Sequence, residues 1–349
     1  MNTIPFPRPR ASASGQNRIE MSHGAGGRAM QRLIADIFHR AFANDALLKG
    51  EDQAVVPVAP GRIALSTDTF VVSPLFFPGG DIGSLAVNGT VNDVAMSGAM
   101  PLYLTAGFII EEGFPLDDLR RIARSMADAA QAAGVSIVTG DTKVVERGKA
   151  DGVFINTTGV GVAAPDPALG ADRIEEGDAI LVSGSIGDHG VAIMAHRAGL
   201  AFDTSIESDC APLNGLIATL LASGVRVKAL RDPTRGGLAA TLNEFATQAR
   251  LGIVVDEGAI PVKPEVFGAC ELLGLDPMNV ANEGKLMAFI AAEDAARALS
   301  VLQSHPLGKE AAIIGRTVVD ANHFVTMRTR LGGSRMVDWL SGDPLPRIC

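Results

Sequence analysis

Residues 104–134 read LTAGFIIEEGFPLDDLRRIARSMADAAQAAG, a strand-like run followed by a helix-like one. The first seven residues are strongly apolar, which is typical of a buried strand. Beyond Pro115, apolar side chains recur at three- and four-residue spacing, which predicts a helix that ends at Gly134. The apolar face of this helix consists of Leu116, Leu119, Ile122, Ala123, Met126 and Ala130. A strand that leads into a helix indicates an α/β layer.

The same alternation extends in both directions along the chain. Upstream, apolar residues recur at helical spacing after SHGAGG, and Ile63 and Leu65 alternate with smaller residues. Downstream, VFINTTGVGVA (153–163) alternates over most of its length. The second half has two helical stretches (212–224 and 236–249) and four strand-like runs, AILVSG, LGIVVD, KLMAFIA and AAIIG.

Residues 163–179 lose this periodicity and collect proline, glycine and aspartate, which marks a domain boundary. We therefore expect an α/β (α+β) protein with two α/β domains. Its predicted parts are a flexible leader (1–18), a first domain (19–165), a second domain (172–330) and a flexible C-terminal tail (331–349).

Composition excludes several classes of function. The 349 residues carry a net charge of −9 that is spread along the chain, which argues against a surface for nucleic acid or an anionic membrane. No apolar run approaches the roughly 20 residues that span a bilayer. Three cysteines without CxxC spacing indicate neither a disulfide framework nor a zinc site. We therefore expect a cytoplasmic protein.

Four aspartates stand beside small residues at the expected ends of strands. They are Asp68 in STD, Asp93 in NGTVNDVAMSGAMP, Asp141 in TGDT and Asp232 in RDPTRGG. Mg²⁺ prefers oxygen ligands, and nucleotide triphosphates need such ions to neutralise their charge, so carboxylates that converge on one cleft suit Mg-ATP. Each aspartate alone is explained equally well as a helix cap or turn residue, and only the four together favour a site.

Three other stretches carry weaker signals. Lys143 is suited to hold a phosphoryl group as a point charge, although an ordinary surface lysine looks the same. Glu283 in ANEGK suits a general base or a metal ligand, and also a solvated turn. The loop HGAGG (23–27) either presents amide groups to an anion or only forms a tight turn. His23 and His189 have no partners at metal-ligand spacing, so we expect them to be hydrogen-bonding residues.

The chain ends in SGDPLPRIC (341–349). Cys210 and Cys270 lie in or beside apolar stretches and are expected to be structural, but Cys349 has no packing reason to be cysteine. A thiolate is a nucleophile that can carry a transferable group. Two prolines favour an extended arm that enters the cleft or reaches a partner.

Together these motifs resemble the HypE family of hydrogenase expression/formation proteins. The resemblance runs from about Ile19 to Cys349 and rests on STD, NGTVNDVAMSGAMP, GDTKVV, DPTRGGL, NEG and the terminal LSGDPLPRIC. The wider superfamily includes aminoimidazole ribonucleotide synthetase, selenophosphate synthetase and thiamine-monophosphate kinase. It shares the acidic, glycine-rich ATP site and the two-domain α/β architecture, but only the HypE branch ends in a PRIC-type tail.

The resemblance implies a role in [NiFe]-hydrogenase maturation. In this family the carbamoyltransferase HypF places a carbamoyl group on the terminal cysteine, here Cys349. ATP-dependent dehydration then converts the thiocarboxamide to a thiocyanate, and the HypC–HypD complex receives the cyanide ligand for the active-site iron. The family also forms homodimers through the first domain, whose sheets pair across a two-fold axis.

The resemblance also implies roles for individual residues. Cys349, Lys143 and Glu283 would be catalytic, with Lys143 contacting phosphate and Glu283 acting as a candidate base. The implied cofactors are ATP and Mg²⁺. The metal ligands would be Asp68, Asp93, Asp141 and Asp232, and the ATP site would also contain Asn92, Gly140 and Thr142.

Two alternatives stay open on the sequence alone. One is another ATP-dependent synthetase or kinase of the same superfamily, although HGAGG lacks the reactive cysteine of selenophosphate synthetases. The other is a non-catalytic scaffold that docks maturation partners through its tail, for which a cluster of carboxylates would have no use.

Overall fold

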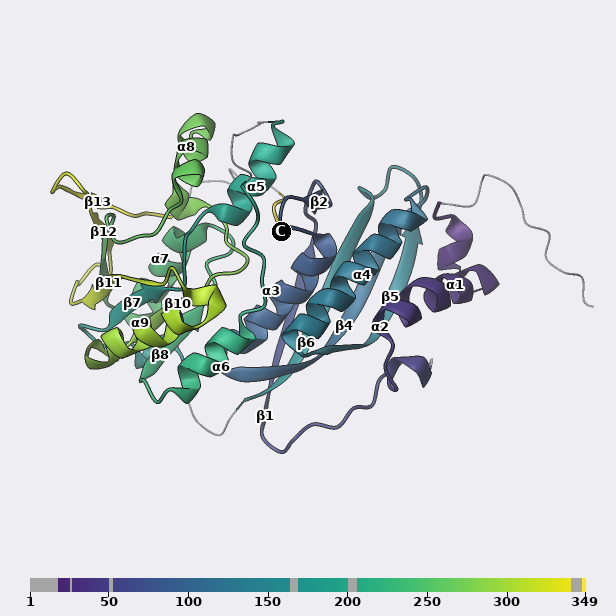
Figure 1. The fold of residues 1–349 in the computed structure, drawn as a ribbon, viewed down its shortest axis with the longest axis horizontal. Coiled ribbons are helices and arrows are strands. Elements are labelled where there is room, and N and C mark those ends of the chain that lie inside the picture. The colour runs from purple at the N-terminus through teal and green to yellow at the C-terminus, as the bar shows by residue number, and fades with distance from the viewer. Residues whose placement is uncertain (1–17, 26, 50–52, 164–168, 200–205, 340–346) are drawn as a thin grey trace, which may run out of the picture.

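The computed structural model describes residues 18–25, 27–49, 53–163, 169–199, 206–339 and 347–349 (Figure 1). The described residues form a four-stranded and a seven-stranded sheet, which lie side by side and are each packed against helices, and a short two-stranded sheet (Phe76–Phe77 with Gly80–Asp81). No helix among them is long and apolar enough to cross a membrane. The predicted leader lies outside the described residues except for Arg18, which bridges to Pro115.

The first sheet has four strands in the order β1, β6, β4, β5. Only the β4 to β5 pairing is parallel. Helices α3 and α4 cover one face of this sheet. The elements of this half are β1 (Arg62–Phe70), β2 (Phe76–Phe77), β3 (Gly80–Asp81), α3 (Ile82–Met96), β4 (Ala99–Glu111), α4 (Leu116–Ala133), β5 (Ser136–Val145) and β6 (Val153–Ala163).

Helix α4 confirms the helix expected after Pro115. All six apolar residues of the expected face are buried, and Gly134 ends the helix in the left-handed conformation with φ of 70°. The helical spacing after SHGAGG is also confirmed. It corresponds to a continuous helical segment made of α1 (Arg28–Leu33), a π-helical stretch (Ile34–His39) and α2 (Arg40–Phe42).

Helix α3 corrects one expectation from the sequence. NGTVNDVAM lies inside this helix, so Asp93 stands in its last turn and not at the end of a strand. Asp81 caps the helix by accepting hydrogen bonds from the amides of Gly83 and Ser84. Because α3 is buried on nearly every side, its small and apolar residues show no helical periodicity.

The second sheet has seven strands in the order β13, β12, β9, β11, β7, β10, β8. Helices lie on both of its faces, which explains continuous apolar runs such as AILV in β7. Ile180 and Val182 pack toward α7, whereas Ala179 and Leu181 pack toward α6 and α9. The elements are β7 (Ala179–Val182), α5 (Asp188–Arg197), α6 (Asn214–Ala222), β8 (Val227–Arg231), α7 (Gly237–Ala249), β9 (Gly252–Asp256), α8 (Pro264–Leu273), β10 (Met287–Ile290), α9 (Ala295–Ser304), β11 (Ala312–Val318), β12 (Val325–Arg328) and β13 (Ser334–Met336).

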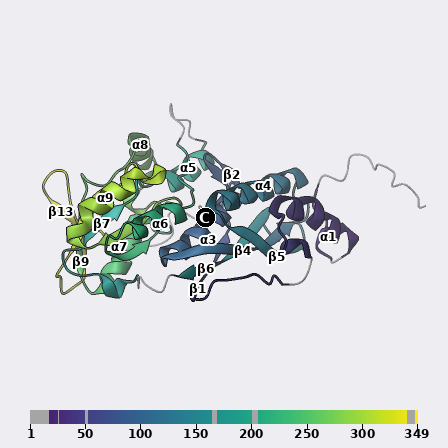
Figure 2. The same cartoon turned by 60° about the horizontal axis from the view of Figure 1, so that its bottom comes forward.

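The C-terminal residues differ from the expected flexible tail. Strand β13 pairs with β12 at the edge of the second sheet, and Val337 is buried. Residues 347–349 return to the middle of the molecule, where the C-terminus lies beside β2 and α3 in both views (Figures 1 and 2). Residues 340–346, which include the two prolines of the tail, lie outside the described residues.

Candidate functional site

Four of the predicted acidic residues meet between the two sheets. Asp68 lies near the end of β1, Asp93 in the last turn of α3, Asp232 just after β8, and Glu283 in the loop before β10. The Ser66 hydroxyl donates to Asp93 Oδ2 at 2.7 Å. Asp232 and Glu283 are buried, with 9% and 3% of their surface exposed. The four carboxyl groups influence one another electrostatically, which supports the predicted convergence on one site.

The pKa values of Asp93, Asp232 and Glu283 are raised, mainly by burial and further by neighbouring groups of the same charge. Burial raises the pKa of Asp232 to about 7, and the neighbouring Asp93 is the next largest cause. Burial likewise raises the pKa of Glu283 well above its usual value, with Asp232 and Asp209 adding to the effect. The pKa of Asp93 is raised by burial, against the hydrogen bond from Ser66.

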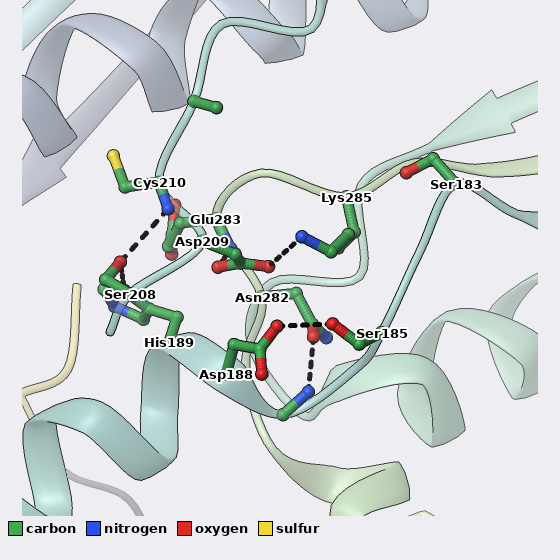
Figure 3. Close-up of polar contacts among 12 residues, drawn as sticks. Ser183, Ser185, Asp188, His189, Ser208, Asp209, Cys210, Asn282, Glu283 and Lys285 are labelled. Carbon is green, nitrogen blue, oxygen red and sulfur yellow. Dashed lines mark hydrogen bonds and ion pairs between the residues drawn. The ribbon is translucent and has the colours of Figure 1, made fainter. Parts of the chain in front are cut away.

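The Glu283 loop is held by buried polar contacts (Figure 3). The Glu283 amide donates to Asp209 Oδ1 at 3.0 Å, and Lys285 Nζ lies 3.3 Å from Asp209 Oδ2. Gly284 passes so close to the Asp209 carbonyl that a Cβ atom there would lie 1.7 Å from its oxygen. One carboxylate oxygen of Glu283, Oε1, is buried without a hydrogen-bond partner. The loop therefore presents an unsatisfied carboxylate to the centre of the molecule.

Asn92 joins this loop to the first domain. Its side-chain amide donates to the carbonyls of Ala211 and Glu283, and its oxygen accepts from the Leu213 amide at 2.7 Å. The side chain is fully buried. Its observed contacts are therefore structural, and its predicted place in the ATP site stays a prediction.

A cavity of about 620 Å³ opens beside the cluster, between the two domains. This volume is within the range of small-molecule sites. Asp93 and Asp232 line it together with Arg231 and Arg235. The DPTRGG loop leads from Asp232 to the first turn of α7, where helix amides and the helix dipole favour an anion. The cavity thus combines carboxylates for a cation with positive groups for phosphate.

The carboxylates suit Mg²⁺ only with help from a ligand. Among the described residues, no group of three or more acidic, histidine or cysteine side chains is arranged to hold a metal ion alone. Mg²⁺ in nucleotide sites is typically bound by one or two carboxylates plus phosphate oxygens. Repulsion from Asp93, which adds to the raised pKa of Asp232, is the kind that a divalent cation relieves. The residues therefore fit Mg²⁺ bound together with a nucleotide.

Asp141 and Lys143 lie apart from this cluster within one chain. Both are on β5, 3.9 Å from each other, and both side chains are 67% exposed. Strands β1 and β5 are the opposite edges of the sheet, so roughly 14 Å of sheet separates Asp68 from them at about 4.8 Å per strand. Asp141 pairs in register with Gly107 of β4, and Gly107 pairs with Asn156 of β6. Asp141 and Asn156 therefore lie on the face of the sheet that α3 does not cover. The expected convergence of all four aspartates does not occur within a single chain.

The remaining predicted residues on β5 serve the strand itself. Gly140 approaches β4 so closely that a Cβ atom would lie 2.1 Å from the Ala106 carbonyl oxygen. Thr142 is buried, and its amide donates to Asp141 Oδ1. His23 accepts a hydrogen bond from the Glu20 amide in the short helix Met21–Gly24, which packs on β5. Gly24, the second residue of HGAGG, lies against Val144, the residue after Lys143.

The terminal cysteine lies at the end of β1. The Val71 amide donates to an oxygen of the Cys349 terminal carboxylate at 3.1 Å, and Val71 is three residues beyond Asp68. The Cys349 side chain packs against the core of the first domain, which also contains Phe70. A Cβ atom on Gly89 of α3 would lie 3.0 Å from the Phe70 ring and 3.8 Å from Glu283 Oε2. The terminal residue is therefore held at the end of the strand that carries Asp68 of the carboxylate cluster.

Sequence reasoning missed the Asp209–Lys285 ion pair. Both side chains are largely buried, at 2% and 13% exposure. Lys285 follows NEG directly and Asp209 precedes Cys210, but no local pattern pairs residues so far apart in the chain. A second buried carboxylate, Asp188, accepts from Ser185 and pairs with Lys263 at 3.1 Å. The spacing of residues around GSIG likewise does not predict that Asp188 pairs with Lys263.

Comparison with known proteins identifies the family. Residues 50–163 match the family model of the AIR synthase related protein N-terminal domain, and residues 175–328 match that of the C-terminal domain. The carbamoyl dehydratase HypE of Rhizobium leguminosarum bv. viciae is 62% identical over 333 residues, which cover 95% of each protein. The chain belongs to the HypE family of carbamoyl dehydratases.

Solved structures of HypE proteins have the same fold. A crystal structure of the hydrogenase maturation protein HypE in complex with ATP has a TM-score of 0.91 at 50% identity, covering 95% of this chain and 99% of that one. A HypE–HypF complex matches with a TM-score of 0.78 at 51% identity, covering 88% and 99%. Membership of the HypE family confirms the resemblance read from the motifs and sets aside the other branches of the superfamily.

Proposed function

We propose that this HypE-family protein dehydrates a carbamoyl group carried on Cys349, using ATP bound beside the carboxylate cluster. One observation carries the proposal: the terminal cysteine is docked at the end of β1, where its backbone oxygen accepts from the Val71 amide, three residues beyond Asp68 of the carboxylate cluster. The HypE structure solved with ATP supports the nucleotide. A cavity of suitable size beside Asp93 and Asp232 supports its location.

The chemistry follows from the properties of an amide. The thiocarboxamide oxygen attacks the γ-phosphorus of ATP and releases ADP. Two protons leave the nitrogen, the C–O bond breaks, and phosphate departs to leave the nitrile of a thiocyanate. The net change is thiocarboxamide and ATP to thiocyanate, ADP and phosphate. Mg²⁺, when bound, neutralises the charges of the phosphates and the carboxylates.

Glu283 is the candidate base for the proton on nitrogen. A carboxylate whose pKa is raised by burial is a stronger base once its proton has left. Its Oε1 atom has no hydrogen-bond partner in the structure and is therefore available to accept a proton. The Asp209 carboxylate and the close approach at Gly284 fix the backbone from which this side chain projects.

We propose further that the site is completed by a second copy of the chain. Asp141 and Lys143 lie on β5, at the edge opposite the carboxylate cluster. The face of the first sheet that α3 and α4 leave uncovered is apolar. It exposes Ile63, Leu65, Met100 and Ile109 at 56%, 70%, 63% and 45%. Pairing of two such sheets across a two-fold axis would bury this face and bring Lys143 of each copy toward the carboxylate cluster of the other copy.

The predicted partners follow from the same reaction. The solved HypE–HypF complex supports HypF as the carbamoyl donor for Cys349. A thiocyanate then supplies the cyanide ligand of the [NiFe]-hydrogenase iron through the HypC–HypD complex. We place these steps in the cytoplasm.

Intact-protein mass spectrometry tests the reaction. After incubation with HypF, carbamoyl phosphate and ATP, the C-terminal peptide should first gain a carbamoyl group and then lose one water. Cys349→Ala should bind nucleotide normally and gain no mass. Loss of water from any other peptide, or none with ATP and Mg²⁺ present, would refute the proposal.

Mixing two inactive variants tests the shared site. Asp93→Asn and Lys143→Ala chains should each be inactive as homodimers. If Lys143 acts in the partner's site, one site of a mixed dimer regains both residues, and re-association of equal amounts should recover about a quarter of the activity. No recovery, with mixed dimers demonstrated by native mass spectrometry, would place both residues in one chain.

A further inference from the structure

Each of the last three residues accepts a hydrogen bond at its backbone oxygen, and the Arg347 side chain also donates to the Val71 carbonyl at 3.1 Å and pairs with Asp151. The Arg347 carbonyl accepts from the Ser73 amide at 3.1 Å and from Arg197 Nη2 at 2.9 Å. The Ile348 carbonyl lies 2.7 Å from His189 Nε2. An oxygen of the Cys349 terminal carboxylate accepts from the Val71 amide. Three consecutive backbone oxygens thus have specific donors, and the Ile348 side chain is buried in the core of the first domain.

Among these donors, His189 is the fully buried side chain. It stands in the first turn of α5, at 0% exposure, with its ring edge-on to Phe77 at 5.7 Å. Burial lowers the pKa of the imidazole, so the ring is neutral at neutral pH. A carbonyl oxygen can only accept, so the single ring proton must be on Nε2, pointing at Ile348.

The other ring nitrogen fixes this tautomer. His189 Nδ1 lies 2.8 Å from Ser208 Oγ, and with the proton on Nε2 it must accept from the Ser208 hydroxyl. Ser208 Oγ in turn accepts from the Cys210 amide at 3.1 Å. Figure 3 shows His189 beside Ser208, on the segment that continues into Asp209.

This segment also positions the candidate base. Asp209, the next residue after Ser208, accepts the Glu283 amide proton. A continuous set of hydrogen bonds and covalent links therefore runs from the Ile348 carbonyl through His189, Ser208 and Asp209 to Glu283. The same chain of contacts therefore positions both the backbone that carries the terminal sulfur and the backbone that carries the candidate base.

We propose that His189 is a positioning residue that holds the C-terminal tail in the site. It donates through Nε2 to the Ile348 carbonyl in the tautomer that Ser208 selects, and so fixes the backbone that carries Cys349. The proposal rests on the proposed function for what the sulfur carries, but the contact itself does not. Because the donor reads a backbone carbonyl, it holds the tail whether Cys349 bears a thiol, a thiocarboxamide or a thiocyanate.

Alkylation of Cys349 measures how tightly the tail is held. The full-length protein, without nucleotide or partner, is treated with N-ethylmaleimide, and the modified C-terminal peptide is followed by mass spectrometry. His189→Ala should speed alkylation at Cys349 roughly tenfold, as expected for one lost buried hydrogen bond. His189→Gln, which offers an N–H donor at similar reach, should return the rate to within about twofold of the original.

Controls separate tail release from general damage. His305→Ala removes a histidine that caps the short helix Pro306–Gly308 in the second domain, and it should leave alkylation at Cys349 unchanged. Nucleotide affinity should be equal in all variants. An unchanged alkylation rate in a His189→Ala protein that still binds nucleotide would overturn the proposal.

Two measurements keep the proposal testable in other ways. ¹⁵N NMR of the unmutated protein should show His189 protonated at Nε2 and unprotonated at Nδ1, and the opposite tautomer would overturn the proposal even if His189→Ala fails to fold. In carbamoylated protein, His189→Ala should slow thiocyanate formation and His189→Gln should restore it, and an unaltered rate in His189→Ala would refute the positioning role. If alkylation and NMR agree with expectation but the unmutated protein forms no thiocyanate, the proposed function fails while the tail contact stands.

Discussion

Replacing Asp232 by asparagine should stabilise the protein without nucleotide while weakening its binding of Mg-nucleotide. Burial and the nearby Asp93 raise the pKa of Asp232 from an ordinary value of 3.8 to about 7. An unfolded chain therefore gives up this proton near pH 4, whereas the folded protein retains it until about pH 7. Between these values the folded state binds more protons, so stability falls as pH rises.

The size of the effect follows from the same two pKa values. A difference of about 3 pKa units corresponds to about 4 kcal/mol of lost stability once the pH exceeds 7, as an upper value for a buried coupled group. Asparagine has nearly the same shape and no charge. Asp232→Asn should therefore match the original near pH 4, exceed it by about 1 to 2 kcal/mol at pH 5, and by up to about 4 kcal/mol at pH 8.

Urea unfolding at pH 4.5, 6 and 8 would measure this difference, provided that the slope with denaturant is the same in both proteins. Asp172→Asn is the matched control, because the Asp172 side chain is 83% exposed and its charge stays in contact with water in the folded protein. A stability difference that does not grow with pH, or an asparagine variant that is less stable at pH 8, would refute the electrostatic argument. Mg-nucleotide affinity, measured by calorimetry, should fall in Asp232→Asn and not in Asp172→Asn.

Three other variants test the site. Lys143→Ala should accept a carbamoyl group but accumulate thiocarboxamide in the mass spectrum, and normal thiocyanate formation would remove Lys143 from the reaction. Lys285→Ala leaves the buried Asp209 carboxylate without its cation and should lower the free energy of unfolding by about 3 kcal/mol, measured by urea titration. Gly284→Ala would place a Cβ 1.7 Å from the Asp209 carbonyl oxygen and should lower thermal stability and activity together. Gly268→Ala in α8 has open space and should instead stabilise by up to about 1 kcal/mol.

Two kinds of element are predictable from the sequence: helices that bury one face, and short strands that are buried on both faces. Helix α4 has an apolar face and a polar one, so its spacing was informative. Strand β7 is buried on both faces within four residues, which gives the continuous run AILV. Helix α3 has neither signature, because the sheet, α4 and the second domain surround it. The sequence around Asp93 therefore predicts the end of a strand, where the structure has a helix.

The site could be predicted only as far as local patterns reach. Asp68, Asp93, Asp232 and Glu283 stood out because each follows or precedes an apolar element next to small residues. The separation of Lys143 from them depends on strand order, which places β5 at the far edge, and no spacing along the chain encodes that order. The contacts of the tail were equally hidden, since they join backbone carbonyls to Ser73, His189 and Arg197.

The two halves of the site differ in how they respond to charge. The carboxylate cluster carries an electrostatic cost, since Asp93 adds to the raised pKa of Asp232 and Asp232 to that of Glu283, and binding of a cation with a nucleotide would relieve that cost and stabilise the folded state. The tail is held by the neutral imidazole of His189, by the backbone amides of Val71 and Ser73, and by two arginine side chains, since Arg197 donates to the Arg347 carbonyl and Arg347 pairs with Asp151. None of these groups belongs to the carboxylate cluster, so the contacts of the tail do not require the cluster to be occupied. These backbone contacts also leave out the Cys349 side chain, so they can hold the tail while its sulfur carries a different group.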